Sequence, residues 1–130
     1  MIEKLRINNK IICITGANGL VGRNLVNSLL KYNCIIKILT KTQPKNFSKK
    51  INFYVGDLSQ PNLNLQPFLN GCDVFINCAA EKINIKKMYP LHVDSVSRLI
   101  SAIKKNFLVE KKKNTFYSNK FLRSLWIFKF

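Results

Sequence analysis

Three glycines at regular spacing give this sequence its clearest chemical signal. Gly16, Gly19 and Gly22 lie in the run TGANGLVG, between a short apolar run and an amphipathic segment. Gly16 permits a sharp turn out of a strand, Gly19 permits a ligand to approach the backbone, and Gly22 permits close packing of a helix on a sheet. The amides at the start of that helix, with its partial positive charge, would face an anion. The pattern therefore predicts a site for a pyrophosphate group.

The segments on either side of these glycines predict the elements that hold them. Residues 11–14 are a continuous apolar run, typical of a strand that is buried on both faces of a parallel sheet. Residues 20–32 repeat apolar side chains at helical spacing, so a helix follows the turn. Further strands are expected at residues 35–39, 53–55 and 73–78, and a short helix at 61–71 that begins at Pro61 and is closed by Gly71. This alternation predicts an α/β fold, a Rossmann-type doubly wound parallel sheet with strand order 3-2-1-4.

A last helix is predicted at residues 91–107. Its apolar side chains share one face, which we expect to pack on the sheet: Val93, Val96, Ile100, Ile103 and Phe107. After Asn106 the periodicity fails, and residues 107–130 form a basic, aromatic tail. A stub of a fifth strand at residues 115–118 and an amphipathic segment on a membrane surface are alternatives for this tail.

The glycine spacing is G-x-x-G-x-x-G, which differs from the G-x-G-x-x-G fingerprint. The run ITGANGLVGRNLV resembles the short-chain dehydrogenase/reductase superfamily, and within it the extended branch known as the NAD-dependent epimerase/dehydratase family. The resemblance implies that residues 1–106 form an NAD(P)-binding Rossmann half-domain. It also implies that the cofactor is held by the residues of the glycine turn: Gly16, Ala17, Asn18, Gly19, Leu20, Val21, Gly22 and Arg23.

Three further motifs carry the resemblance. The segment Gly56-Asp57-Leu58 resembles a family motif whose aspartate accepts a hydrogen bond from the adenine amino group. Asp57 could instead cap the following helix. In Asn77-Cys78-Ala79-Ala80 the small residues Ala79 and Ala80 imply a close approach of the cofactor ribose. In the stretch 88–94 His92 replaces the family's asparagine, and we interpret it as a helix cap rather than as a catalyst.

The choice between NAD and NADP depends on the end of the second strand. NAD-selective relatives place a carboxylate there to bind the ribose 2′-hydroxyl. Here the segment reads KILTK, and Lys41, together with Arg23, could bind a 2′-phosphate. We therefore expect NADP or NAD as the cofactor, with a preference for NADP.

The family's catalytic pair, Tyr-x-x-x-Lys on one helix, is absent from this sequence. The residues four positions after the tyrosines are Ile36, Leu58, Val93 and Phe121. Without the lysine, no cation would lower the pKa of a tyrosine or orient the nicotinamide ribose. The family also has a C-terminal portion that binds a substrate, commonly a nucleotide-linked sugar, for which 130 residues leave no room. We therefore assign no catalytic residue.

The amino-acid composition narrows the classes of function that remain. The net charge of +16 would attract phosphates, but the excess of lysine, asparagine and isoleucine also fits A- and T-rich codons. No nucleic-acid-binding motif accompanies the charge, so nucleic acid is an unlikely partner. The four cysteines lie far apart in apolar surroundings, which favours buried thiols over metal ligands or disulfides. We see neither a signal peptide nor a membrane span, and we expect a cytoplasmic protein.

Three hypotheses follow. The first is a truncated epimerase/dehydratase of nucleotide-sugar metabolism, produced by fragmentation, an early stop or a frameshift near residue 106, that binds the cofactor without catalysis. Its unpaired sheet edge would invite association, so oligomers are expected. The second is a non-catalytic sensor module that docks a partner through its basic tail. The third is a protein that uses the tail on nucleic acid.

Overall fold

The computed structural model describes residues 7–43, 48–79 and 83–113. Its centre is a parallel sheet of four strands: β1 (Ile11–Thr15), β2 (Ile35–Thr40), β3 (Ile51–Val55) and β4 (Val74–Asn77). The strands lie in the order β3-β2-β1-β4. The predicted α/β fold class and the order 3-2-1-4 are therefore confirmed.

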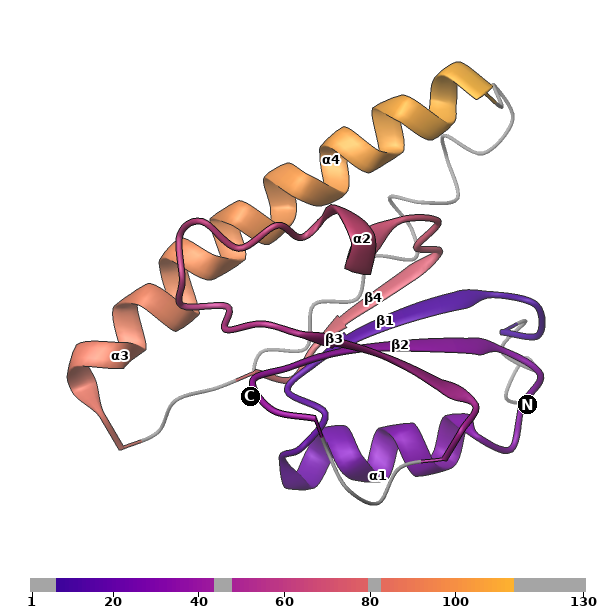
Figure 1. The fold of residues 1–130 in the computed structure, drawn as a ribbon, viewed down its shortest axis with the longest axis horizontal. Coiled ribbons are helices and arrows are strands. Elements are labelled where there is room, and N and C mark those ends of the chain that lie inside the picture. The colour runs from indigo at the N-terminus through magenta and orange to yellow at the C-terminus, as the bar shows by residue number, and fades with distance from the viewer. Residues whose placement is uncertain (1–6, 44–47, 80–82, 114–130) are drawn as a thin grey trace, which may run out of the picture.

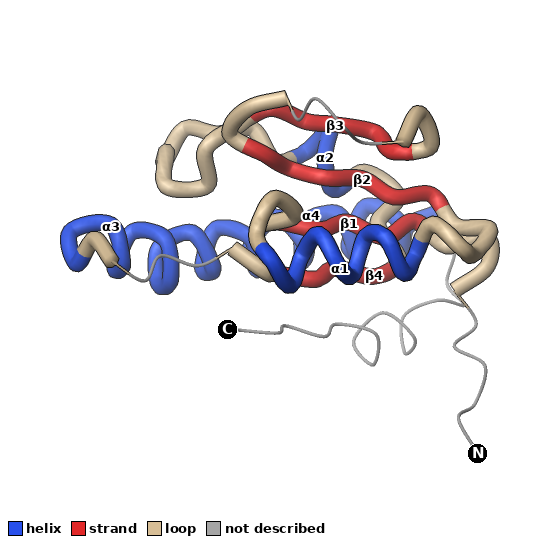
Figure 2. Tube along the Cα trace, turned by 90° about the horizontal axis from the view of Figure 1, so that it is seen from below, coloured by secondary structure: helices blue, strands red, loops and turns tan. Residues whose placement is uncertain are grey.

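Helices cover both faces of this sheet, as Figures 1 and 2 show. Helix α1 (Leu20–Leu29) lies on one face, whereas α2 (Gln66–Leu69) and α4 (Ser95–Lys113) lie on the other. Because side chains alternate along a strand, β1 contributes to two separate clusters of buried residues. Ile12 and Ile14 belong to the cluster of α1, and Cys13 belongs to the cluster of α2 and α4.

The helix predicted from Pro61 is shorter than expected. Residues 61–62 form a turn, residues 63–65 are not helical, and α2 begins only at Gln66. The side chain of Asn64 accepts a hydrogen bond from the Gln66 amide, and Pro67 takes the place in the first helical turn that suits proline. Gly71 does close the segment, with a φ of +72°.

The last helix begins earlier and ends later than predicted. Helix α3 (Ile85–Tyr89), a π-helical turn η1 (Pro90–Asp94) and α4 follow one another directly. The side chain of Asn84 caps α3 by accepting a hydrogen bond from the Lys86 amide. Pro90 cannot donate to the preceding turn, and the helix widens there. Since α4 extends to Lys113, the expected boundary at residue 106 falls inside a helix, and the stub expected at residues 115–118 lies outside the described residues.

The buried face of α4 also differs from the predicted one. Val93 is 41% exposed, and the face on the core is formed instead by Ser95, Leu99, Ile103 and Asn106. Of the predicted side chains whose burial the structure describes, Ile103 alone is on the buried face; the predicted Phe107 side chain lies outside the described side chains. The prediction followed apolar residues alone, whereas the structure buries two polar side chains whose oxygen atoms have partners. The Ser95 hydroxyl donates to the Leu91 carbonyl, and Asn106 Oδ1 accepts from Gln66 Nε2 at 2.6 Å.

Candidate functional site

Two of the three glycines are required by the fold itself. Gly16 has a φ of +69°, and a Cβ there would lie 2.4 Å from the backbone of Cys78 and of Ala79. At Gly22 a Cβ would lie 2.2 Å from the Gly16 carbonyl oxygen. The start of α1 therefore packs against the glycine turn, and the turn packs against the chain that leaves β4.

Gly19 differs from both. Its backbone is extended, with φ −72° and ψ 168°, and a Cβ would meet only the Gly16 carbonyl oxygen at an ordinary 3.5 Å. Gly19 is exposed and caps α1, and no side chain makes a capping hydrogen bond there. Nothing in the described chain requires a glycine at this position. The space in front of its backbone is open to a ligand.

The other residues predicted in the glycine turn differ in exposure. Asn18, Val21 and Arg23 are exposed, and Leu20 is 82% exposed, so their surfaces face the open space around the start of α1. Ala17 is 0% exposed and belongs to the cluster under α1. Its side chain therefore supports the turn from inside and does not line a surface.

Two residues to which the sequence analysis gave no role, Thr15 and Asn77, tie the ends of β1 and β4 together. Thr15 and Asn77 are both buried, and the Thr15 hydroxyl donates to Asn77 Oδ1 at 2.6 Å. The same oxygen accepts the Ala79 amide at 3.1 Å. This arrangement holds Ala79 against the glycine turn, while Ala80 lies outside the described residues. In the sequence, the only indication of this hydrogen bond is that each of the two buried strands ends in a polar residue.

Asp57 begins a turn directly after β3. Its Oδ1 accepts hydrogen bonds from the Ser59 amide at 2.9 Å and from the Ser59 hydroxyl at 2.7 Å. The alternative that Asp57 caps a helix is wrong, because a turn follows and α2 begins later. Leu58 is 7% exposed and packs in the core below this turn. Leu58 thus anchors the turn, and Asp57 remains on the surface.

Hydrogen bonds and nearby charges favour the ionised form of the Asp57 carboxylate. Burial raises the pKa of Asp57, but the hydrogen bonds from Ser59 and the charges of Lys41 and Lys87 outweigh burial, so the pKa lies below its ordinary value. Lys41 Nζ lies 3.9 Å from Asp57 Oδ2. The structure thus brings together two of the residues that the sequence analysis assigned to the adenosine half of a cofactor.

His92 lies within η1 and is half-buried. It stands well inside the continuous helix that begins at Ile85, so its interpretation as a helix cap is wrong, and Asn84 caps that helix instead.

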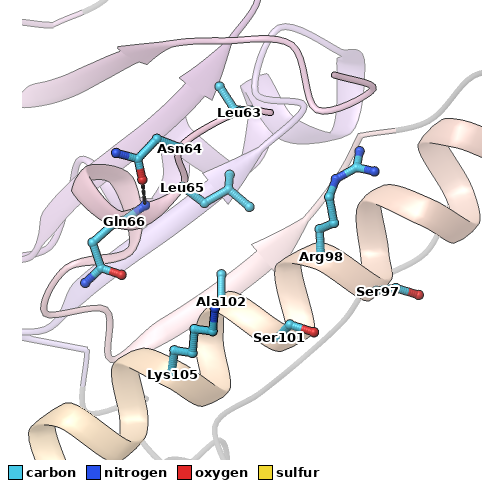
Figure 3. Close-up of a pocket in the computed structure, with 9 residues that line it drawn as sticks. All are labelled: Leu63, Asn64, Leu65, Gln66, Ser97, Arg98, Ser101, Ala102 and Lys105. Carbon is cyan, nitrogen blue, oxygen red and sulfur yellow. Dashed lines mark hydrogen bonds between the residues drawn. The ribbon is translucent and has the colours of Figure 1, made fainter. Parts of the chain in front are cut away.

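A groove of about 400 Å³ lies elsewhere, between α4 and the segment before α2 (Figure 3). None of the predicted site residues lines it. Its walls include Leu63, Gln66, Arg98 and Lys105.

Two further kinds of feature are missing from the part of the chain that the structure describes. No three or more His, Cys, Asp or Glu side chains are grouped so that they could hold a metal ion. Among the described helices, none combines the length and hydrophobicity that crossing a membrane requires.

Known proteins resemble this chain in sequence or in structure. The highly reducing polyketide synthase sthA from Phaeosphaeria nodorum is 27% identical over 115 residues, which cover 74% of this chain and 4% of that protein. A short chain dehydrogenase from Leptospira borgpetersenii with bound NAD+ is 21% identical, with a TM-score of 0.66, over 82% of this chain and 48% of that one. MoeE5 in complex with UDP-glucuronic acid and NAD is 21% identical, with a TM-score of 0.64, over 75% of this chain and 33% of that one. The chain therefore spans less than half of each of these proteins.

The likeness to the two solved structures establishes the fold. Membership is established by a family model, that of the NAD dependent epimerase/dehydratase family, which matches residues 12–117. That match includes the glycine turn, the Asp57 turn and the end of β4. Because it extends over most of the sequence, the chain belongs to the NAD dependent epimerase/dehydratase family.

Proposed function

We propose that this chain binds the adenosine diphosphate portion of NAD or NADP at the carboxyl ends of β1 and β2. The observation that carries the proposal is the geometry of Gly19. Gly16 and Gly22 are explained by contacts within the chain, but Gly19 is not. A ligand that must come close to the backbone accounts for the absence of a side chain there.

The start of α1 suits the pyrophosphate chemically. A helix N-terminus carries partial positive charge and amides that lack partners within the helix. Because no side chain caps α1, a phosphate oxygen can accept hydrogen bonds at this end without displacing one. The net charge of +16 adds a general attraction for anions.

The adenosine would extend from the pyrophosphate toward the end of β2. There the ionised Asp57 would accept a hydrogen bond from the adenine amino group, and Lys41 would face the ribose. The Leptospira dehydrogenase and MoeE5, both solved with NAD, support a dinucleotide as the ligand. The preference for NADP rests on Lys41 and stays a prediction.

The complex of MoeE5 with UDP-glucuronic acid supports a nucleotide sugar as the substrate of a full-length relative. For this chain we propose cofactor binding without catalysis, because Tyr-x-x-x-Lys is absent from the sequence. The cytoplasmic location, the oligomers and the docking of a partner through the tail stay predictions.

Titration of ADP-ribose into the full chain tests the proposed function. We expect saturable binding that NAD and NADP displace, since all three share the groups assigned to the site. Short duplex DNA is the control, because a chain with a charge of +16 attracts any polyanion. Salt-dependent binding of DNA without saturation by ADP-ribose would contradict the proposal.

A further inference from the structure

Arg98 connects α4 to the turn that carries Asp57. Its Nη2 donates a hydrogen bond to the Leu58 carbonyl oxygen at 2.6 Å, across 40 positions of sequence. A hydrogen bond from a guanidinium is charge-assisted and stronger than one between neutral groups. The contact was not foreseen from the sequence, where Arg98 is one of 22 basic residues without a distinguishing motif.

The hydrogen bond from Arg98 holds the backbone of the turn that carries Asp57. The Leu58 carbonyl belongs to the residue directly after Asp57, inside the turn that is closed by the Gln60 amide on the Asp57 carbonyl. The Leu58 side chain holds the turn from the core side, and Ser59 holds the Asp57 carboxylate. Arg98 adds the contact from α4. The turn is thereby held from the core by Leu58, at the carboxylate by Ser59, and at the Leu58 carbonyl by Arg98.

The groove beside α4 leaves the hydrogen bond from Arg98 as a specific link between α4 and the Asp57 turn. Arg98 lines the groove with Leu63 and Leu65, so side chains do not fill the space between α4 and this part of the chain. In Figure 3 the Arg98 side chain extends away from α4, and Lys105 lies farther along the same helix, with its side chain directed toward Ala102. The guanidinium therefore reaches the turn across a place where packing alone does not define the distance.

We propose that Arg98 is a positioning residue that sets the selectivity of this site for adenine. The inference rests on the proposed dinucleotide binding. Arg98 does not touch the ligand; it holds the Leu58 carbonyl so that the Asp57 carboxylate faces the adenine amino group. Loss of Arg98 leaves the glycine turn and α1 as they are. It lowers the preference for adenine over a base without that amino group.

The test compares NAD with nicotinamide hypoxanthine dinucleotide, which carries a carbonyl oxygen where adenine has its amino group. Both ligands are titrated into the wild-type chain, Arg98→Met and Arg98→Lys. A hydrogen bond to a charged group leads us to expect that the wild type prefers NAD by about tenfold or more. Arg98→Met should bind both ligands about equally. Arg98→Lys keeps a cation with a shorter reach, and it should restore part of the preference.

Lys105→Met is the matched control. It removes the same charge from the same groove about two helical turns away, and it should keep the wild-type preference. If Arg98→Met weakens both ligands by the same factor, or keeps the preference, the positioning role is refuted. If Arg98→Met does not fold, an unchanged preference in Arg98→Lys refutes it.

The affinities of the wild-type chain for the two ligands distinguish failure of this inference from failure of the proposed function. Tight binding of both ligands without a preference would leave the dinucleotide site intact and overturn the inference, because Asp57 would then not read the base. Binding of neither ligand would overturn the proposed function itself, and the inference with it.

Discussion

The ammonium of Lys41 lies 3.9 Å from the carboxylate of Asp57 and thereby joins the end of β2 to the turn after β3. Lys41 is largely exposed, so the pair adds little to stability. Its effect is on the site. The same lysine helps to keep Asp57 ionised, and it places a cation where a ribose 2′-phosphate would lie in the proposed complex. A phosphate there would share Lys41 with Asp57.

Gly19→Val should weaken dinucleotide binding while the fold is retained. The extended backbone at Gly19 accepts a β-branched residue, and the open space accommodates its side chain. The valine would occupy the position proposed for the pyrophosphate, so the affinity for ADP-ribose should fall by about tenfold or more. Calorimetric titration measures the affinity, and circular dichroism checks the fold. Asn27→Val, at an exposed site on α1, is the control, and equal affinities of the two variants would refute the site.

Gly16→Ala should destabilise the chain more than Gly71→Ala does. Both glycines have a positive φ, which costs an alanine about 1–2 kcal/mol. A Cβ at Gly16 would also collide with backbone at 2.4 Å, whereas at Gly71 it meets only the flexible end of Ile11 at 3.0 Å. Overpacking adds about 1–3 kcal/mol for Gly16→Ala. Denaturant unfolding measures the difference, and equal losses would contradict the close packing of the turn.

Lys41→Asp should shift the preference from NADP toward NAD. The change removes the cation proposed for the 2′-phosphate and adds a negative charge, so the ratio of the two affinities should change by about tenfold. Lys49→Asp makes the same change of charge before β3, at the opposite end of the strands. If both variants change the ratio equally, net charge rather than position explains the effect.

Ser59→Ala should raise the pKa of Asp57. Burial raises this pKa, but the Ser59 hydrogen bonds and the charges of Lys41 and Lys87 lower it further than burial raises it. Because the folded pKa lies below the unfolded one, ionised Asp57 stabilises the fold above its unfolded pKa. That contribution is lost as the pH falls through the folded pKa. Titration of the carboxyl carbon by NMR measures the change, and an unchanged pKa in the variant would contradict the role of the hydroxyl.

The chain should not turn over nucleotide sugars. General acid–base catalysis typically contributes about 10²–10⁴ to a rate, and the Tyr-x-x-x-Lys pair that would supply it is absent from this sequence. UDP-glucuronic acid with NAD is a suitable pair of probes, and NADH absorbance records the reaction. Turnover above the background without enzyme would show that another residue replaces the missing pair.

Local sequence patterns were sufficient to predict most of the fold. The apolar run at residues 11–14 and the glycines after it correctly predicted β1, the turn and α1, because strand, turn and helix each have their own residue preferences. The strand order followed from the alternation of strands with helices and the right-handed crossovers that this requires. These features depend on residues that are neighbours in sequence.

The features that the sequence could not predict depend on partners far away along the chain. Val93 and Leu99 both fit a helical stripe, and only the position of the sheet decides that Leu99 is buried. Nothing near Arg98 in sequence indicates that it reaches the Leu58 carbonyl. Likewise, α2 begins late because Asn64 and Pro67 together define its first turn, and Pro61 alone did not reveal this.

The contact of Gly16 with Cys78 and Ala79 also determines when the site can exist during folding. The hydrogen bond from Thr15 to Asn77 spans 62 positions, so the glycine turn reaches its final shape only after β4 has joined β1. We expect contacts of such separation to form late, because a long loop must close first. A ribosome that has released only β1 and α1 therefore presents the complete glycine sequence without a competent binding loop. Competence begins when β4 docks.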